Sequence, residues 1–390
     1  MRHFGHLTSE QRSELFHREP QEFTADAPAG TLAVALGATL YSPATRPRLA
    51  DDIRKQAGQG VVSMVLCLED SIDDRDVVAG EANLVQQFAD LASRPDPAGS
   101  IPLLFIRVRT PAQITDLVER LGETVALLSG FVLPKFTEET GVPFLEALTH
   151  AEAASGRRLF AMPVLESPQL LHLESRVETL QGISRTVEKY RDRVLAMRLG
   201  VTDFCASYGL RRAPAMTAYD VQIVASVIAD VVNIFGRADG SGFTVSGPVW
   251  EYFRHHERMF KPQLRVSPFR PEAVNLREEL LAQDMDGLLR EIELDRANGL
   301  QGKTCIHPTH VPVVHALNVV THEEFCDAAD ILHEDRSGGG VLRSVYTNKM
   351  NEVKPHRAWA ERTLRRAETF GVAREEIGFV ELLGASLPSS

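Results

Sequence analysis

The sequence predicts an α/β protein of the (β/α)8 TIM-barrel class, with an N-terminal arm and a C-terminal helical extension. Three observations predict this fold. Eight short apolar runs recur along the first three quarters of the chain, amphipathic stretches separate them, and the runs lack polar–apolar alternation. Near-continuous apolar runs are typical of parallel strands that are buried on both faces. Eight strand–helix repeats favour a closed barrel over an open sheet.

Each apolar run is predicted to contain one strand of the barrel. The runs are TLAVALGATLYSP ending at Pro43, VVSMVLCLED at Asp70, IPLLFIRVR at Arg109, ALLSGFVLPK at Lys135, RLFAMPVLES at Ser167, VLAMRLGVTD at Asp203, FTVSGPVWEYF around Ser246 and GKTCIHP at Pro308. Apolar residues at helical intervals predict helices between the runs. These helices are expected over residues 47–59, 74–93, 111–121, 138–155, 168–190, 218–235 and 271–297.

The rival fold is an open dinucleotide-binding sheet, but no Gly-x-Gly-x-x-Gly follows the first run. The glycine-rich segment Ala238–Gly242 precedes a strand, so we interpret it as a turn. The predicted division is an arm at 1–30, the barrel at 31–335 and a hinged helical segment at 336–390. The glycines Gly338–Gly340 form either a plain linker or a hinge for a segment that closes over the site.

Composition and charge restrict the classes of function. Lys and Arg number 42 against 53 Asp and Glu, and the resulting net charge of −11 argues against nucleic acid and membrane surfaces as partners. The four cysteines form neither a disulfide framework nor a Cys-x-x-Cys metal motif. The N-terminal sequence lacks the apolar run of a signal peptide, and no run reaches the roughly 18 apolar residues of a membrane span. We therefore expect a cytoplasmic protein.

Charged residues stand at the ends of six predicted strands, the position where barrel enzymes carry their reacting groups. They are Glu69, Asp70, Arg107, Lys135, Glu166, Asp203 and His307. Each acid alone could cap the helix that follows it. Chance explains six charged strand ends poorly, because charges are expensive inside a core unless they are paired or bound to metal.

The types of these residues indicate the chemistry of the site. Glu166 and Asp203, with the two acids that end the second run, form an oxygen-rich set that suits Mg²⁺ better than zinc. Arg107 and Lys135 could neutralise a substrate carboxylate or a developing enolate, or simply pair with the acids. The absence of a Gly-x-Ser-x-Gly elbow and of a Walker loop argues against covalent serine hydrolysis and P-loop chemistry.

Seven motifs in order along the chain resemble those of the HpcH/HpaI aldolase and citrate lyase β-subunit superfamily. They are Tyr41-Ser42-Pro43 with Arg46-Pro47-Arg48, Cys67–Ser71, Ile106-Arg107-Val108, Leu133-Pro134-Lys135, Val164–Ser167, Gly200–Asp203 and Gly299–Pro308. Two positions depart from the family pattern, since Cys67 replaces an aspartate and Ala44 replaces a loop glycine. The two terminal segments resemble a divergent branch linked with tellurium-resistance and stress gene clusters.

The resemblance implies a Mg²⁺-dependent carbon–carbon lyase or aldolase that acts through an enolate on a 2-oxo or hydroxy acid. It implies that Glu166 and Asp203 hold the metal. The implied catalytic residues are Glu69, Asp70, Arg107 and Lys135, and the implied substrate contacts are Tyr41, Arg46, Arg48 and Arg107. Arg46 and Arg48 either meet the phosphates of a CoA thioester or are plain surface charge.

Several alternatives stay open at this point. The enzyme could act on free oxo acids without CoA, or the barrel could be a non-catalytic subunit of a stress-linked complex, against which the charged rim argues. The proton-transfer group is either Asp70 or a residue of the C-terminal segment or of a neighbouring subunit. The resemblance further implies a homo-oligomer, a trimer or a pair of trimers.

Overall fold

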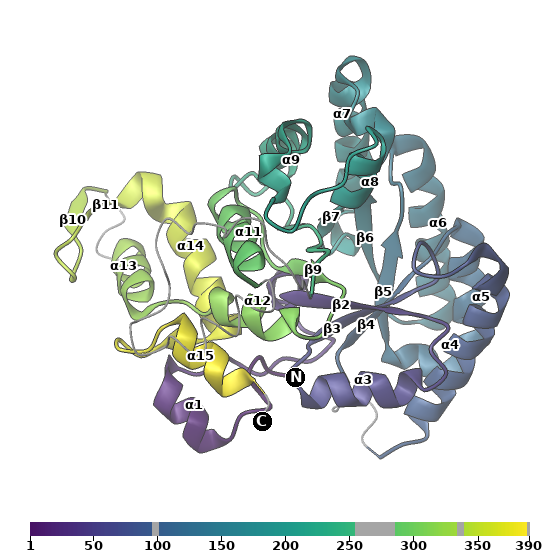
Figure 1. The fold of residues 1–390 in the computed structure, drawn as a ribbon, viewed down its shortest axis with the longest axis horizontal. Coiled ribbons are helices and arrows are strands. Elements are labelled where there is room, and N and C mark those ends of the chain that lie inside the picture. The colour runs from purple at the N-terminus through teal and green to yellow at the C-terminus, as the bar shows by residue number, and fades with distance from the viewer. Residues whose placement is uncertain (96–100, 254–284, 334–338, 388–390) are drawn as a thin grey trace.

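The computed structural model describes residues 1–95, 101–253, 285–333 and 339–387, and a ring of eight parallel strands forms its centre (Figure 1). The strand order is β8-β7-β6-β5-β4-β3-β2-β9. Gly247 closes the ring, because it pairs with Lys303 of β9 and its carbonyl accepts a hydrogen bond from the Thr304 N–H at 3.1 Å. The strands are β2 (Ala38–Pro43), β3 (Ser63–Cys67), β4 (Leu103–Arg107), β5 (Leu128–Leu133), β6 (Phe160–Leu165), β7 (Met197–Leu199), β8 (Val245–Ser246) and β9 (Lys303–Cys305). The predicted barrel is confirmed, and every predicted run contains one of these strands.

Helices follow the strands and cover the outside of the barrel (Figure 1). They are α3 (Leu49–Gly58), α4 (Val77–Ala92), α5 (Pro111–Leu121), α6 (Glu138–Ser155), α7 (Leu173–Lys189), α8 (Val201–Ala206), α9 (Gln222–Phe235), α11 (Met285–Ala297) and α12 (His310–Asn318). Short 3₁₀ turns lie at Asp74–Asp76, Gly122–Leu127, Pro168–Leu170, Arg191–Arg193 and Ala218–Asp220. The predicted bounds of α5 and α6 are confirmed; the first part of the predicted helix 271–297 lies outside the described residues.

Local sequence signals explain where α6 begins and ends. The Thr137 hydroxyl accepts a hydrogen bond from the Thr140 N–H at the start of the helix. The helix ends at Gly156, which has a φ of +63°, a left-handed conformation that glycine adopts without a steric penalty. The chain can therefore turn sharply into β6.

The first apolar run differs from its expected form, because its first half is a helix. Residues Ala29–Ala35 form α2, and only the second half continues as β2. Leu32 and Leu36 pack into the same apolar cluster as the inward-facing side chains Val65 and Phe105 of the barrel. An apolar run that plugs the amino end of a barrel has the same composition as a buried strand, so the pattern alone could not separate the two.

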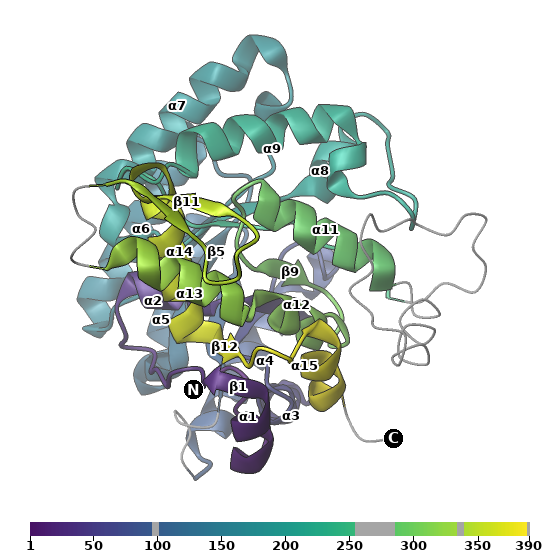
Figure 2. The ribbon, with the colours of Figure 1, turned by 90° about the vertical axis from the view of Figure 1, so that its left-hand side faces the viewer.

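The two ends of the chain pack together beside the barrel (Figure 2). Strand β1 (Phe16–Arg18), which follows α1 (Ser9–Leu15), pairs antiparallel with β12 (Val372–Ala373). The remaining C-terminal elements are α13 (His322–Leu332), the hairpin of β10 (Val341–Arg343) and β11 (Met350–Glu352), α14 (Val353–Phe370) and α15 (Phe379–Ser386). Gly338 lies outside the described residues, so the choice between a linker and a hinge stays open. The division of the chain at residues 30 and 335 also stays a prediction.

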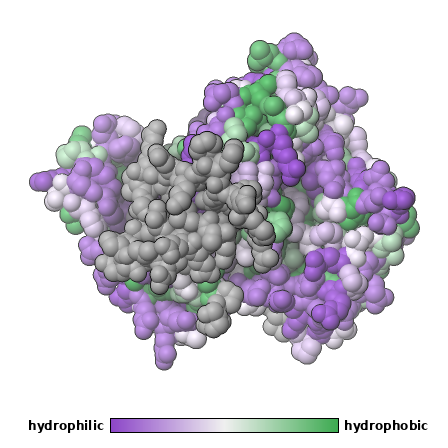
Figure 3. Space-filling view, viewed as in Figure 1, coloured by the Kyte–Doolittle hydropathy of each residue, from purple (hydrophilic) through white to green (hydrophobic). Residues whose placement is uncertain are grey.

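Among the described residues on the face shown in Figure 3, hydrophilic residues predominate and hydrophobic residues form scattered patches. Charged residues make up 24% of the chain, an ordinary share for a globular protein. None of the helices in the described ranges is both long enough and apolar enough to cross a membrane.

Buried histidines join the arm to the barrel. The His3 ring lies 4.1 Å from the Phe370 ring and 4.5 Å from the His315 ring, centroid to centroid, and His3 Nε2 is 3.0 Å from the Ala35 carbonyl. Burial lowers the pKa of His3 from 6.5 to about 3, although the Ala35 hydrogen bond opposes this shift. Burial also lowers the pKa of His315.

This environment predicts that His3 makes the protein less stable in acid. Between pH 6.5 and about 3 the unfolded chain binds a proton at His3 that the folded protein does not, so stability is lost as the pH falls. Urea unfolding at about pH 7 and about pH 5.5 should show that His3→Leu loses about 1 kcal/mol less over this interval than the wild type. Equal losses in both proteins would contradict a neutral buried His3.

Candidate active site

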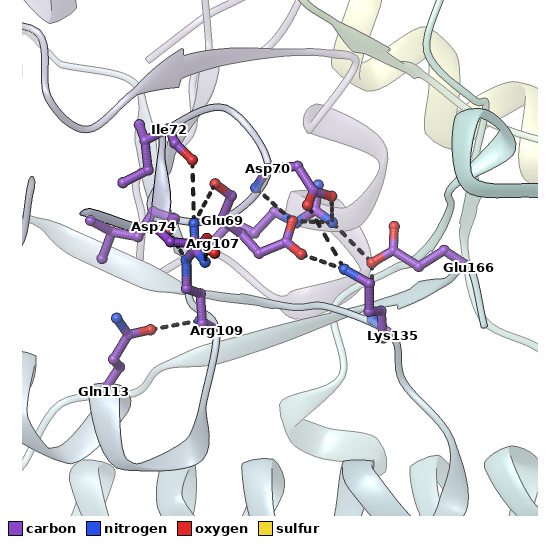
Figure 4. A network of polar contacts seen from close by, with 10 residues as sticks. Glu69, Asp70, Ile72, Asp74, Arg107, Arg109, Gln113, Lys135 and Glu166 are labelled. Carbon is purple, nitrogen blue, oxygen red and sulfur yellow. Dashed lines mark hydrogen bonds and ion pairs between the residues drawn. The ribbon is translucent and has the colours of Figure 1, made fainter. Parts of the chain in front are cut away.

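Five of the charged residues predicted at the strand ends form one network at the carboxyl ends of β3 to β6 (Figure 4). The Arg107 Nη2 atom lies 2.7 Å from Glu69 Oε2, 2.9 Å from Glu166 Oε1 and 3.3 Å from Asp70 Oδ2. The Lys135 Nζ atom donates to Glu69 Oε1 at 2.6 Å. Parallel strands bring their carboxyl ends to the same end of a barrel, which is why residues so far apart in the sequence meet here.

The backbone of Lys135 is held in an unusual conformation. Its φ is +47°, in the left-handed region that non-glycine residues rarely occupy. In this conformation the Lys135 N–H donates to Glu166 Oε1 at 2.9 Å, while its side chain reaches Glu69. Such conformations cost about 1–3 kcal/mol and persist where the surroundings fix them, commonly at functional sites.

Glu69 and Asp70 differ sharply in acidity although they are neighbours. Burial would raise the pKa of Glu69, but hydrogen bonds from Asp70 and Lys135 and the charge of Arg107 outweigh it and lower the pKa to about 2. Burial and the charge of Glu69 raise the pKa of Asp70 to about 6. The pair is arranged so that Glu69 stays ionised while the half-exposed Asp70 can take up or release a proton near neutral pH.

Glu166 is buried, with 1% of its side chain exposed, and its Oε1 atom accepts from both the Arg107 guanidinium and the Lys135 N–H. Burial raises its pKa to about 7; the charge of Arg107 opposes this shift and the charge of Asp203 adds to it. Gly200 lies against this side chain, since a Cβ atom there would come within 2.5 Å of Glu166 Oε2. The absence of a side chain at Gly200 therefore leaves room for Glu166 on the side from which α8 brings Asp203.

The donor set of this cluster fits a hard divalent cation. The carboxylates of Glu69, Asp70, Glu166 and Asp203 outnumber the two cationic side chains of Arg107 and Lys135 at the rim. In the described part of the chain, no three His, Cys, Asp or Glu side chains are grouped so as to enclose a metal by themselves. Two carboxylates completed by waters and substrate oxygens is the arrangement that Mg²⁺ favours.

Arg46 and Arg48 lie apart from this network. The Arg46 Nε atom is 2.6 Å from Asp52 Oδ2, and the Arg48 Nε atom is 3.9 Å from Asp51 Oδ2. Both arginine side chains are exposed, at 53% and 81%. The structure thus pairs them with acids at the start of α3 and does not bring them to the carboxylates.

A buried arginine below the rim was missed by sequence reasoning. Arg198 of β7 is 1% exposed, and its Nη2 atom donates to Thr304 Oγ1 at 2.6 Å. Its guanidinium carbon lies 5.5 Å from the ring centre of Tyr41, and the charges of Arg198 and Arg107 both act on the Tyr41 hydroxyl. Arg198 forms no ion pair within the described residues, so it places an uncompensated positive charge beneath the site.

A second missed group is a buried charge network behind the barrel wall. Lys303 Nζ lies 2.9 Å from Glu291 Oε1 and 2.7 Å from Asp295 Oδ2. Arg212 Nη1 lies 2.7 Å from Glu291 Oε2, and the Tyr219 hydroxyl donates to Asp295 Oδ1 at 2.9 Å. This network ties β9 to α11 and fixes the last strand of the ring.

The model of the C–C bond lyase family of the TIM-barrel fold matches residues 30–372. The chain belongs to this family. The match spans the barrel and the whole of α13 and α14, so the C–C bond lyase family includes part of the C-terminal segment as well. The family resemblance seen in the sequence and the predicted enzyme class, a carbon–carbon lyase, are confirmed. A search of the curated proteins finds no match to this sequence.

Solved structures share the fold of this C–C bond lyase. A citrate lyase of Burkholderia xenovorans LB400 has a TM-score of 0.61 at 14% identity, over 89% of this chain and 96% of the other. The CitE protein of Mycobacterium tuberculosis, solved with magnesium, acetoacetate and coenzyme A, has a TM-score of 0.52 at 21% identity, over 86% of this chain and 99% of the other. At these identities the likeness concerns the barrel fold.

Proposed function

We propose that this C–C bond lyase cleaves or forms a carbon–carbon bond beside a 2-oxo or hydroxy acid, through an enolate and with Mg²⁺ held by Glu166 and Asp203. The observation that carries the proposal is the buried Glu166, whose pKa is raised to about 7 by burial and by the charge of Asp203, against the opposing charge of Arg107. Bound Mg²⁺ would supply Lewis-acid stabilisation of the enolate oxygen. The CitE complex with magnesium and acetoacetate supports this assignment.

The residues of the network have separate tasks in this proposal. Arg107, fixed by three carboxylates, stabilises the developing negative charge of the substrate oxygen. Lys135 keeps Glu69 ionised and orients Glu166 through its N–H. Asp70 exchanges the proton, because its pKa of about 6 lies near neutral pH and its side chain is half exposed.

Two forms of the substrate remain to be distinguished. A CoA thioester would place its phosphates at Arg46 and Arg48, which follow β2 at the same end of the barrel as Glu166, with Tyr41 contacting the acyl part. In the other form, a free oxo acid without CoA, Arg46 and Arg48 have no task beyond their surface ion pairs with Asp52 and Asp51. We further propose that the chain forms a homo-oligomer. We also propose that it lies in the cytoplasm, because a reducing compartment suits the four free cysteines.

A metal-dependent binding assay tests the proposal. Titration calorimetry of the full chain with oxaloacetate, pyruvate and glyoxylate should show binding in Mg²⁺ and none in EDTA. Cleavage or condensation assayed with and without acyl-CoA then decides between the two substrate forms. Oxo-acid binding that is equal in Mg²⁺ and EDTA would contradict the metal site. No turnover with any pair, together with a stable protein partner, would favour the non-catalytic alternative.

A further inference from the structure

Two joined cavities lie at the end of the barrel opposite to Glu166. The larger, about 530 Å³, is lined by residues that precede β7, β8 and β9 and by one face of α14. The smaller, about 380 Å³, continues it along α14, and the two share Val34, Gly299, Gln301 and Arg362. Their sizes are those of small-molecule sites, roughly 300–1,000 Å³.

Arginines outnumber acids in the lining of the larger cavity. Arg237, Arg362 and Arg365 line it, and within the described residues none of the three forms an ion pair. Arg362 donates to the Gly236 carbonyl at 2.7 Å and Arg237 to the Asn233 carbonyl at 2.8 Å, which leaves other N–H groups of both side chains available. Three such guanidinium groups in a chain of net charge −11 favour an anion with several charges.

The two acids that line the larger cavity, Glu361 and Asp239, each have another partner, although the charge of Arg237 also acts on Asp239 and helps to lower its pKa. Glu361 lies 3.3 Å from Arg357, and Asp239 accepts a hydrogen bond from the Ser241 N–H at 2.9 Å. Asp239 belongs to the glycine-rich turn that precedes β8. In that turn Gly242 leaves no space for a side chain, because a Cβ would lie 2.1 Å from the Arg237 carbonyl oxygen. The turn therefore holds Arg237 at the edge of the cavity.

The smaller cavity presents an aromatic ring and an unpaired polar atom. Trp359 of α14 lines it and is 39% exposed, three residues before Arg362 and so on the same helix face. The Gln301 Oε1 atom, at the junction of the two cavities, is buried and finds no hydrogen-bond partner among the described residues. A buried acceptor without a donor is rare, and a ligand hydroxyl or amino group would satisfy it.

We propose that these joined cavities bind a nucleoside polyphosphate, with the base against Trp359, a hydroxyl or amino group at Gln301 and the phosphates against Arg237, Arg362 and Arg365. A planar base matches the exposed indole, since aromatic rings stack on every nucleobase. The phosphates match the guanidinium groups, which bind phosphate oxygens in a bidentate manner. The site is remote from the carboxylate rim, so it would act on the enzyme without contacting its substrate.

Tryptophan fluorescence of the full chain reports on this site directly. The chain has two tryptophans, and the other one, Trp250, is 1% exposed, so quenching by a solute at the cavity comes from Trp359. In EDTA, ADP should quench this emission with a saturable dependence, and adenosine should do so far more weakly. Arg365→Gln and Arg237→Gln should each raise the Kd for ADP about tenfold, a size expected for one charge-assisted contact. The matched control Arg343→Gln, at an exposed arginine of β10, should leave the Kd unchanged.

Four outcomes would overturn the proposal. The first is that ADP at about 1 mM does not quench the emission, and the second is that the wild type and Arg365→Gln bind ADP with equal affinity. The third is that inorganic pyrophosphate binds as tightly as ADP, because the base would then contribute nothing. The fourth is that Arg46→Gln abolishes the quenching, because ADP would then bind at the other end of the barrel. Trp359→Ala removes the signal, so equilibrium dialysis of ADP should show weaker binding in that variant. Coenzyme A also contains an adenosine phosphate group. A parallel titration with CoA therefore shows whether the cavities bind a free nucleotide or the nucleotide part of CoA.

Discussion

The Glu166→Gln variant is expected to lose about a thousandfold or more in kcat on the substrate that the wild type turns over with Mg²⁺. Glutamine keeps the shape of the side chain and an oxygen that can accept from the Lys135 N–H. It removes the negative charge that Arg107 contacts at 2.9 Å and that, with Asp203, would hold the cation. Steady-state kinetics and calorimetric Mg²⁺ titration of the wild type and the variant measure the two losses.

Stability measurements show whether this loss is chemical or structural. Because burial holds the pKa of Glu166 near 7, replacing the carboxylate should leave Tm in EDTA unchanged or raised. Mg²⁺ should raise Tm of the wild type but not that of the variant. Glu139→Gln, at an exposed acid in the first turn of α6, is the matched control and should behave as the wild type. A variant that binds Mg²⁺ normally would remove Glu166 from the metal site.

The largest loss of stability is expected from Lys303→Met. Lys303 is fully buried and contacts the carboxylates of Glu291 and Asp295 at 2.9 Å and 2.7 Å. Removing one partner of a buried ion network leaves the others charged in an apolar surrounding, which typically costs about 3–5 kcal/mol. Urea unfolding followed by circular dichroism measures this change in the free energy of unfolding.

Two further variants separate charge from packing in this network. Lys55→Met replaces an exposed lysine of α3 and should change the free energy of unfolding by less than about 0.5 kcal/mol. Adding Asp295→Asn to Lys303→Met should recover part of the loss, since one uncompensated charge is then removed. If the double variant is no more stable than Lys303→Met, the loss comes from packing and the electrostatic account is wrong.

The barrel and most of its rim could be predicted because their signals are local. Each strand is an apolar run of a few residues, and a charged residue that directly follows a run must lie at the carboxyl end of the barrel. Glu69, Arg107, Lys135 and Glu166 were placed in this way, and the structure brings them within hydrogen-bonding distance. That Glu166 and Asp203 bind metal stays a prediction.

The remaining features depend on contacts that no local pattern encodes. Glu291 and Asp295 lie on α11, whose pattern of charged residues looks in the sequence like that of a solvent-exposed helix face. Both residues are nevertheless buried against Lys303. Arg198 is a single charged residue within the apolar run of β7, and a search for apolar runs gives such a residue no role. The partner of β1 lies near the other end of the sequence, beyond the reach of any periodicity.

That pairing of β1 with β12 affects the order in which the molecule can assemble. Phe16 lies opposite Ala373 and Arg18 opposite Val372, so this contact closes a loop that includes the whole barrel. The entropy of closing a loop grows only with the logarithm of its length, and the strand contacts within the barrel are far more local. During synthesis on the ribosome the strands can associate before β12 is made. The contact between the two ends can then form only after β12 has been synthesised, when all the barrel strands are already present.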